Sequence, residues 1–349
     1  MFGKKGIIGL DIGSSYIKVV QLNELRSGYD LELFDMVPIS PELVVEGSII
    51  DAIRLTDTLK QLLIKARVRA KNAVISVSGH SSVIIKRISL PEMTEEELSE
   101  SIRFEAEQYV PFDIEDVNLD FQILGPKEEP GQMDVILVAV KKDIINDYLS
   151  VVREAGLNPV IVDVDAFALE NMYGVNYEIE PNTNVALINI GASTINMNIL
   201  RGGISVFTRD SSIGASLITE ALQKEYNISY EEAERLKRGE TLDKVNPEEA
   251  HAIISRAVSD ISSEVSRSLG YFKSSTSQQE IHEVILSGGC ALIHEFPKLL
   301  SEKITIAVRT AEPFRNIQIP KKFDRSYIED VAPIAAVAVG LAIRRPGDR

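Results

Sequence analysis

The pattern of apolar and polar residues predicts two similar groups of β-strands, one near the start of the chain and one near its middle. The first begins at Ile7–Leu22 (IIGLDIGSSYIKVVQL) and the second at Val185–Leu200 (VALINIGASTINMNIL). In each, an apolar strand reaches a polar residue, Asp11 or Asn189, turns at a glycine and returns, and a third strand follows. The copies are offset by 178 residues, about half of the chain. This repeat predicts two lobes of one topology, with the two turns facing each other across a cleft.

Helical patterns occupy much of the second half of the chain. The segment from Ser212 to Leu269 is mostly helical, and Ser229 with Glu232 forms a capping box at the start of one of its helices. Val331–Ile343 is apolar on every side. A helix of that length rises only about 20 Å, which is too short to cross a hydrocarbon core of about 30 Å. We therefore expect it to be buried in the core.

The first turn has the chemistry of a phosphate site. Gly13 lets the backbone approach a ligand closely, and Ser14 and Ser15 place hydroxyl groups beside exposed N–H groups. Lys18 would add a positive charge, and Asp11 could hold a hydrated Mg²⁺ between phosphates. An ordinary tight hairpin is the alternative for one such turn. Its repetition at the head of each half favours two turns that grip the phosphates of a nucleotide from both sides.

Two other segments suit the adenosine end of a nucleotide. Ser287–Cys290 (SGGC) follows an apolar strand and precedes a helical segment, so its backbone could approach the sugar and the α-phosphate. A plain loop is the alternative. Glu231, Glu234 and Lys237 form either a solvated helix face or the wall of an adenine pocket.

The composition argues against several other functions. The chain has 37 Lys and Arg against 52 Asp and Glu, a net charge of −15, so we expect neither nucleic-acid binding nor direct membrane insertion. With Cys290 as the single cysteine and four scattered histidines, no disulfide or protein-built metal centre is expected. Asp11 interrupts the first apolar run and no cleavage-site pattern follows, which predicts a cytoplasmic protein.

These segments resemble the motifs of the superfamily that contains actin, heat-shock ATPase chaperones and sugar kinases. The superfamily has five motifs, called phosphate 1, connect 1, phosphate 2, adenosine and connect 2. In this chain they would lie, in that order, at Leu10–Lys18, Val160–Leu169, Asn189–Thr194, Ser287–Ala291 and Pro333–Gly340. Within that superfamily, the chain resembles the PilM family of type IV pilus assembly proteins in the stretches DIGSSYIKVVQL, AGLNPVIVDVDAFALE, LSGGCALI and Leu90–Phe112. The last of these is the most specific, because kinases and chaperones lack it. The resemblance implies an α/β protein with a duplicated actin-like (ribonuclease H-like) two-lobed fold.

The PilM family resembles the division protein FtsA in having an FtsA-type 1C subdomain inserted in the first lobe. The residues agree with this, because Val83–Ile88 reads as a strand, Thr94 and Glu97 cap a helix, two further strands follow and Asp143–Ala155 reads as a second helix. The implied subdomains are 1–82 with 154–180 (1A), 83–153 (1C), 181–213 with 276–349 (2A) and 214–275 (2B).

The resemblance implies a cytosolic adaptor that binds ATP and Mg²⁺ between its lobes. A groove between 1A and 1C would take the cytoplasmic N-terminal peptide of PilN, a single-span membrane protein, and PilN would recruit the adaptor to the inner face of the cytoplasmic membrane within the type IV pilus inner-membrane complex. Self-association is left open. Arg103, Tyr109 and Phe112 are candidates for part of the groove, and packing of Phe104 and Tyr109 against the sheet of the insert is the alternative.

Matching the motifs residue by residue assigns the site. The nucleotide-binding candidates are Gly13, Ser14, Ser15, Lys18, Gly191, Ala192, Ser193, Thr194, Gly214, Glu234, Lys237, Gly288, Gly289 and Cys290. Asp11, Asp163 and Asp165 are the catalytic candidates, and Asp11, with Asn189 acting through water, is the metal candidate. Asn189 stands where the superfamily carries Asp, so a carboxylate that would help to place metal and water is missing. We therefore predict nucleotide binding with slow or absent turnover.

Two other functions share this fold. A sugar or carboxylate kinase would use Asp163 or Asp165 as its catalytic base, but it would give residues 83–153 no role. A membrane-tethered filament former similar to FtsA would carry a C-terminal amphipathic helix, which the ending GLAIRRPGDR does not resemble.

Overall fold

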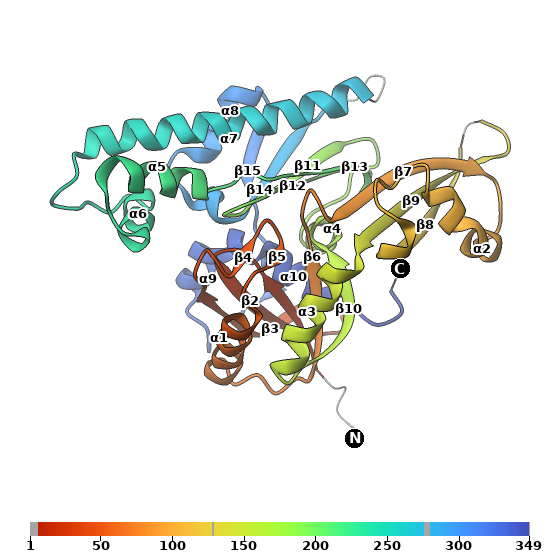
Figure 1. Ribbon diagram of the computed structural model, residues 1–349, viewed down its shortest axis with the longest axis horizontal. Coiled ribbons are helices and arrows are strands. Elements are labelled where there is room, and N and C mark those ends of the chain that lie inside the picture. Colours follow the sequence, from red (N-terminus) through yellow and green to blue (C-terminus); the bar gives the residue numbers. More distant parts are fainter. Residues whose placement is uncertain (1–5, 128, 276–279, 349) are drawn as a thin grey trace.

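The computed structural model, which describes residues 6–127, 129–275 and 280–348, has two lobes that are each built on a mixed β-sheet (Figure 1). The first sheet has the order β10-β6-β1-β2-β3-β16 and the second has the order β13-β12-β11-β14-β15. The strands of the first sheet are β1 (Ile7–Ile12), β2 (Tyr16–Glu24), β3 (Tyr29–Pro38), β6 (Asn72–Val77), β10 (Asn158–Val164) and β16 (Ile317–Gln318). Those of the second are β11 (Asn184–Ile190), β12 (Ile195–Arg201), β13 (Ile204–Ser211), β14 (Glu283–Ser287) and β15 (Ala307–Thr310).

The two sheets confirm the duplication that the sequence predicts. In each, three antiparallel strands (β1–β3 and β11–β13) are followed on the other side by two strands parallel to the first (β6 and β10, β14 and β15). The registers also correspond, because Asp11 faces Lys18 in the first lobe and Asn189 faces Asn196 at the equivalent position of the second. The two turns therefore lie at the same edge of their sheets.

Two helices, α4 (Asp165–Asn176) and α10 (Ala336–Ile343), lie between the sheets and join the lobes. They cross so closely that a Cβ atom on Gly340 would lie 1.7 Å from the carbonyl oxygen of Ala168. Among the described residues, Arg325–Ile343 is the helical stretch that is long and apolar enough to pass for a membrane span, and 61% of its apolar window is buried inside the protein. The prediction that Val331–Ile343 is buried is confirmed for most of its length, since η3 and α10 are buried in the core apart from Ile334 and Ile343, which are half-buried, as is Val331.

Helices cover the outer face of each sheet. In the first lobe these are α1 (Ala52–Lys65) and α3 (Lys142–Glu154), with a small hairpin of β4 (Val44–Val45) and β5 (Ser48–Ile49). The outer helices of the second lobe are α5 (Ser216–Tyr226), α6 (Tyr230–Lys237), α7 (Pro247–Ser275) and α8 (Phe296–Ile304) (Figure 1). Short connecting helices are η1 (Ile114–Asp116), η2 (Gly289–Leu292), α9 (Arg325–Val331) and η3 (Ala332–Ala335).

An insert with its own core extends from the first lobe (Figure 1). It contains a three-stranded antiparallel sheet in the order β7-β9-β8, formed by β7 (Val83–Pro91), β8 (Val117–Pro126) and β9 (Gln132–Lys141), and the helix α2 (Glu95–Ala106). Thr94 and Glu97 form the predicted capping box. All of the helix α3 except its last residue lies within the predicted range 83–153, but its buried side chains Ile144, Tyr148, Val151 and Val152 belong to the core of the first lobe.

The subdomain boundaries given above stay predictions. The boundary at residue 276 lies outside the described residues.

Candidate functional site

A cavity of about 340 Å³ lies between the lobes where the two hairpin turns face each other. Strand ends and helix ends from both lobes line it, in addition to the turns themselves. The predicted site residues in its lining are Asp11, Gly13, Ser14, Ser15, Lys18, Asp165, Asn189, Gly191, Ala192, Thr194, Glu234, Lys237, Gly288 and Gly289. Asp163, Ser193, Gly214 and Cys290 were also predicted but are not part of the lining.

The two turns are closed in the same way. The Gly13 N–H donates to the Tyr16 carbonyl at 3.1 Å, and the Gly191 N–H donates to the Thr194 carbonyl at 2.9 Å. The hydroxyl groups of Ser14 and Ser193 are hydrogen-bonded to each other across the cleft. Ser193 is therefore in contact with Ser14 and outside the cavity lining, and the two turns meet beside the cavity.

Asp11 and Lys18 form a buried ion pair at the base of the first turn. Lys18 Nζ lies 2.6 Å from Asp11 Oδ2, and the two residues are only 9% and 7% exposed. Their facing positions on β1 and β2 follow from the tight turn between the strands. The pair provides one anion and one cation on the same wall of the cavity, which suits a metal-bound phosphate group.

Asp165 is a further carboxylate in the cavity lining, beside Asp11 and Glu234. It begins α4, and Ser76 Oγ at the end of β6 donates a hydrogen bond to its Oδ1 at 2.5 Å. Burial, together with the negative charge of Asp11, raises the pKa of the Asp165 carboxyl to about 6. A carboxylate with that pKa can accept a proton near neutral pH.

The catalytic prediction for Asp163 does not fit the structure. Its carboxylate lies 3.1 Å from Arg344 Nε, away from the cavity lining. The chain passes from β10 into α4 between Val164 and Asp165, so the strand alternation that would place Asp163 and Asp165 on one face is broken there. Burial raises the pKa of the Asp163 carboxyl, while the charge of Arg344 opposes this effect.

Asn189 occupies the second turn's counterpart of the Asp11 position. Its Nδ2 donates to Asn196 Oδ1 and its Oδ1 accepts from Ser287 Oγ, both at 3.2 Å. The second lobe therefore presents a hydrogen-bonded amide to the cavity, where the first lobe presents a charged pair.

Glycine lets the backbone come close to this side of the cavity. Gly288 has a φ of +86°, and a Cβ atom there would lie 2.4 Å from the Ile190 carbonyl oxygen. Gly214 packs the start of α5 against the second turn, since its Cβ atom would lie 2.4 Å from the Ala192 carbonyl oxygen. The side chain of Cys290 lies in the core of the second lobe, outside the cavity lining, and burial raises the pKa of its thiol to about 12.

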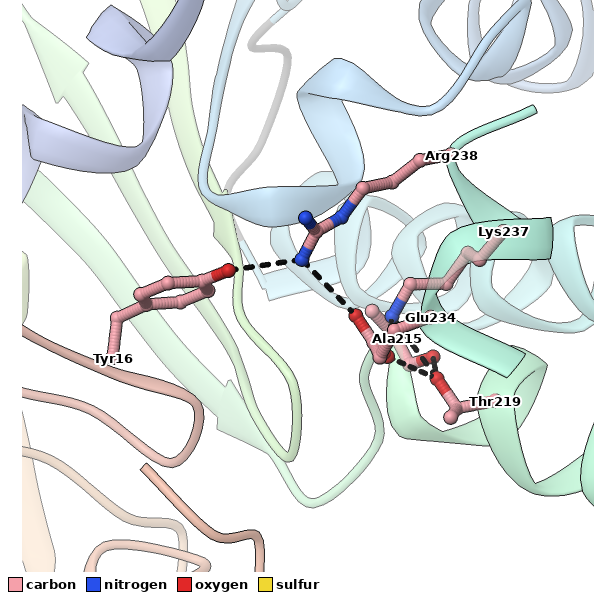
Figure 2. Close-up of polar contacts among 6 residues, drawn as sticks. All are labelled: Tyr16, Ala215, Thr219, Glu234, Lys237 and Arg238. Atoms are coloured by element: carbon pink, nitrogen blue, oxygen red, sulfur yellow. Dashed lines mark hydrogen bonds and ion pairs between the residues drawn. The ribbon is translucent and has the colours of Figure 1, made fainter. Parts of the chain in front are cut away.

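Figure 2 shows a network of polar side chains from α5, α6 and the first hairpin. Lys237 Nζ donates to Thr219 Oγ1 at 3.0 Å and is paired with Glu234, and Thr219 Oγ1 donates to Glu234 at 2.6 Å. Arg238 Nη2 donates to Tyr16 Oη at 2.9 Å and so connects the two lobes at the cavity (Figure 2). The prediction omitted Tyr16 and Arg238, although each directly follows a residue that it included.

The insert and the first lobe each have a sheet that ends in an edge strand. β8 ends the insert sheet and β10 ends the first-lobe sheet. The negative charge of Asp120 on β8 adds to the effect of burial on the pKa of Asp163 on β10. Tyr109 and Phe112 pack against the insert core, but Phe104 is 68% exposed, so the alternative of a core position for Phe104 is wrong.

No group of three or more His, Cys, Asp and Glu side chains that could hold a metal ion occurs within residues 6–127, 129–275 and 280–348. Asp11 can still share an ion with bound phosphates, because Mg²⁺ commonly takes one or two carboxylates together with phosphate oxygens and water. The donor set at the first turn thus fits an ion that arrives with a nucleotide.

Comparison with known proteins gives consistent results. The family described as "Type IV pilus assembly protein PilM" matches residues 9–346. The cell division protein FtsA of Bacillus subtilis (strain 168) is 24% identical over 320 residues, covering 85% of this chain and 69% of FtsA. A chain of the solved "PilM-PilN type IV pilus biogenesis complex" matches with a TM-score of 0.86 and 29% identity, covering 98% of this chain and 99% of that chain. MreB 5 of Spiroplasma citri bound to AMPPNP, with a TM-score of 0.53, 16% identity and coverage of 97% and 95%, shares the fold.

Proposed function

Since the chain belongs to the PilM family of type IV pilus assembly proteins, we propose that it is a nucleotide-binding adaptor of the pilus assembly machinery. It binds ATP with Mg²⁺ in the cavity between its lobes, and it binds the cytoplasmic N-terminal peptide of PilN between the insert and the first lobe. PilN holds it at the inner face of the cytoplasmic membrane as part of the inner-membrane complex.

The observation that carries the nucleotide proposal is the pair of equivalent turns that meet in one cavity. Backbone N–H groups at Ser14 and Ser15 and at Ala192 can hold phosphate oxygens from both sides. Lys18 neutralises phosphate charge, and Asp11 holds the hydrated Mg²⁺. The Glu234–Lys237 network and the close backbone approach at Gly288 suit the sugar and base.

Turnover is slow because the second lobe lacks a charged group at position 189. Replacing Asn189 with Asp supplies a second carboxylate that helps to place metal and water, so we expect at least a tenfold rise in single-turnover hydrolysis of ATP. Asn189→Ser, which leaves the site uncharged, is the control. An unchanged rate in the Asp variant that still binds Mg·ATP would reject this explanation for slow turnover.

The support for the peptide site is that the insert sheet and the first-lobe sheet each end in an edge strand, β8 and β10. The edge strands β8 and β10 can each pair with an extended chain, and the exposed Asp120 adds a negative charge on β8. We expect the peptide to bind as an extended segment with a basic residue near Asp120. The solved structure described as a PilM–PilN complex, which this chain matches over 98% of its length, supports the choice of partner.

Calorimetric titration tests both parts of the proposal. The purified chain is titrated with Mg·AMPPNP, and separately with a synthetic peptide of the cytoplasmic N-terminus of the PilN protein from the same genome. We expect saturable binding of each with one site per chain. Nucleotide binding without peptide binding would reject the adaptor function and favour a kinase, and substrate screening with an Asp165→Asn control would follow.

A further inference from the structure

A second cavity, of about 400 Å³, lies at the other end of the strands that lead to the nucleotide cavity. β11 lines the nucleotide cavity near its end, at Asn189, and lines the second cavity near its start, at Val185. The other walls come from the C-terminal half of α4, from the segment 178–183 that follows it, and from residues 309–316 between β15 and β16. The nucleotide proposal gives this second cavity no role.

Two stacked tyrosines form one wall of the second cavity. The ring centroids of Tyr173 and Tyr177 are 4.9 Å apart, and the ring planes are inclined by 10°. Tyr177 Oη accepts a hydrogen bond from the Glu312 N–H at 2.8 Å. Tyr173 is only 5% exposed, and within the described residues its hydroxyl group makes no hydrogen bond. A hydroxyl group that lines a cavity without a partner indicates a place for a polar group of a ligand.

Both arginines of this cavity already have acidic partners. Arg309 on β15 is paired with Glu283 on β14. Arg315 Nη1 lies 3.6 Å from Glu312 Oε2, and its guanidinium carbon lies 5.6 Å from the centre of the Tyr177 ring. Because these cations are matched by carboxylates, we do not expect the cavity to bind an anion.

Two carboxylates of this cavity lack a cationic partner. Glu178 and Glu180 are exposed at its wall, and neither is paired with a cation within residues 6–127, 129–275 and 280–348. Glu180 Oε2 accepts a hydrogen bond from the Thr183 hydroxyl group at 3.0 Å. An ionised carboxylate can accept about four hydrogen bonds, so both glutamates keep room for N–H donors. The charge that remains to be neutralised at the cavity is therefore negative.

We infer that the second cavity binds a small aliphatic polyamine, a chain of methylene groups with an ammonium group at each end. Its carboxylates come from two separate elements, Glu178 and Glu180 from the segment after α4 and Glu283 from β14. One ligand can therefore place an ammonium group at each of them. Charge-assisted hydrogen bonds of this kind are among the stronger ones in proteins.

The rest of the lining suits the body of such a ligand. Methylene groups can pack on Val185 and on the Tyr173 ring, whose hydroxyl group accepts a hydrogen bond from an ammonium N–H. A volume of about 400 Å³ lies in the range of small-molecule sites, about 300–1,000 Å³. It exceeds what one lysine side chain of a partner protein would fill, which favours a free polyamine. This inference does not depend on the proposed function.

Calorimetric titration of the purified chain with spermidine tests the inference. In about 0.15 M KCl the Debye length is about 8 Å, so general attraction between a polycation and an acidic protein is screened. We expect saturable binding with one site per chain. In the Glu178→Gln, Glu180→Gln double variant, which keeps an acceptor for Thr183, spermidine should bind at least about tenfold more weakly. Tyr173→Phe keeps the ring and should weaken binding about fivefold.

Two controls separate a built site from general electrostatic attraction. The Glu96→Gln, Glu100→Gln double variant removes the same charge from the exposed face of α2 in the insert, and it should bind spermidine as the parent does. Mg²⁺ at the same concentration as spermidine should not displace it, because a hydrated metal ion cannot use the apolar wall. Equal weakening by the two double variants, or displacement by Mg²⁺, would overturn the inference.

The remaining outcomes also decide the question. The inference is wrong if spermidine shows no saturable binding, or if the Glu178→Gln, Glu180→Gln variant binds it with full affinity. Tighter binding of the tripeptide acetyl-Gly-Lys-Gly-amide than of spermidine would overturn the choice of a free polyamine. The proposed function is tested with nucleotide and PilN peptide in separate titrations, so either proposal can fail while the other stands.

Discussion

At the scale of single residues, the charges beside the cavity depend on one another. Asp11 and Lys18 are buried on facing strands with their charged atoms 2.6 Å apart. Removing one member of a buried ion pair leaves the other charged and unpaired, which commonly costs about 3–5 kcal/mol, whereas removing both can be neutral. The pair therefore has a structural role in addition to its proposed role toward the nucleotide.

We expect Lys18→Met to lower the free energy of unfolding by about 3 kcal/mol, because Asp11 is left buried without its partner. The Asp11→Asn, Lys18→Met double variant should recover most of this loss but should not recover nucleotide binding. Urea unfolding and calorimetry measure the two properties. A double variant that is as unstable as Lys18→Met would show that the ion pair is not the source of the effect.

Glu170 on α4 gives a pH-dependent prediction. Burial raises the pKa of its carboxyl to about 7, with the charge of Asp163 adding to the effect and the Asn198 amide opposing it. The unfolded chain ionises near pH 4.5, so the folded chain binds the proton more tightly and loses stability as the pH rises from about 4.5 to 7. A difference of one pKa unit is worth about 1.4 kcal/mol, so the total loss is about 3 kcal/mol.

In the Glu170→Gln variant this contribution is absent. Urea unfolding at pH 5 and pH 8 should show the variant to be about 2–3 kcal/mol more stable than the parent at pH 8, with a much smaller difference at pH 5. Parallel stability curves for the two proteins would contradict the raised pKa. Burial also raises the pKa of the Asp165 carboxyl. Since Asp165 is present in both proteins, its contribution to the pH dependence cancels when their stabilities are compared.

The positions of some site residues could be predicted from the sequence, and those of others could not. Asp11, Lys18 and the glycines of the turns belong to a local hairpin, and local geometry could be inferred from spacing alone. Asp163 was misplaced because its partner, Arg344, is 181 positions away, and no pattern within one segment indicates such a pairing. Arg238 was missed for the same reason, since its contact with Tyr16 exists only when the lobes are packed together.

At the scale of elements, α10 packs closely against α4 and β1, and Val337 of α10 and Asp165 of α4 line the cavity. Gly340 and Gly9 allow this close packing: a Cβ atom on Gly9 would lie 2.3 Å from the Ala338 carbonyl oxygen. The hairpin strands were predictable as apolar runs that turn at a glycine, and α10 from its uniform apolarity. The membership of α3 in the first-lobe core was not, because its amphipathic pattern shows that one face is buried but not against which sheet.

We expect Gly340→Ala to destabilise the protein by at least about 3 kcal/mol, because its new methyl group would overlap the α4 backbone at Ala168. Gly174→Ala on α4 is the matched control, since no heavy atom lies within 4 Å of a Cβ built there. That change should stabilise the protein by about 0.5 kcal/mol through helix propensity. Thermal unfolding of both variants tests the pair, and equal effects would contradict the close crossing.

At the scale of the whole molecule, hydrogen bonds across the cleft connect the two lobes. They include Ser14 with Ser193 between the two turns and Arg238 with Tyr16 beside the Glu234–Lys237 network. Each must break when the lobes open to release a ligand. The rate of release therefore depends on contacts that do not touch the ligand itself.

We expect Tyr16→Phe to release a fluorescent ATP analogue about fivefold faster than the parent chain, because a hydrogen bond of this kind is worth about 1 kcal/mol. Tyr327→Phe, on α9 outside the cavity lining, should release it at the parent rate. Stopped-flow displacement measures both rates. Equal release rates from the parent and from Tyr16→Phe would show that the hydrogen bond between Tyr16 and Arg238 does not slow the opening of the lobes.

The pairing of β7 with β9 in the insert sheet, beside which the Lys141 N–H donates to the Ser82 carbonyl, has a consequence for the history of the fold. The first and last residues of the insert lie side by side, as paired ends of β7 and β9. Because the two ends of the insert are already held together within the insert, the first lobe does not have to bring them together at an entropic cost. Such a module can be gained, lost or exchanged between related proteins by recombination, with a short turn in its place, and a lineage could thereby acquire a new partner without rebuilding its nucleotide cavity.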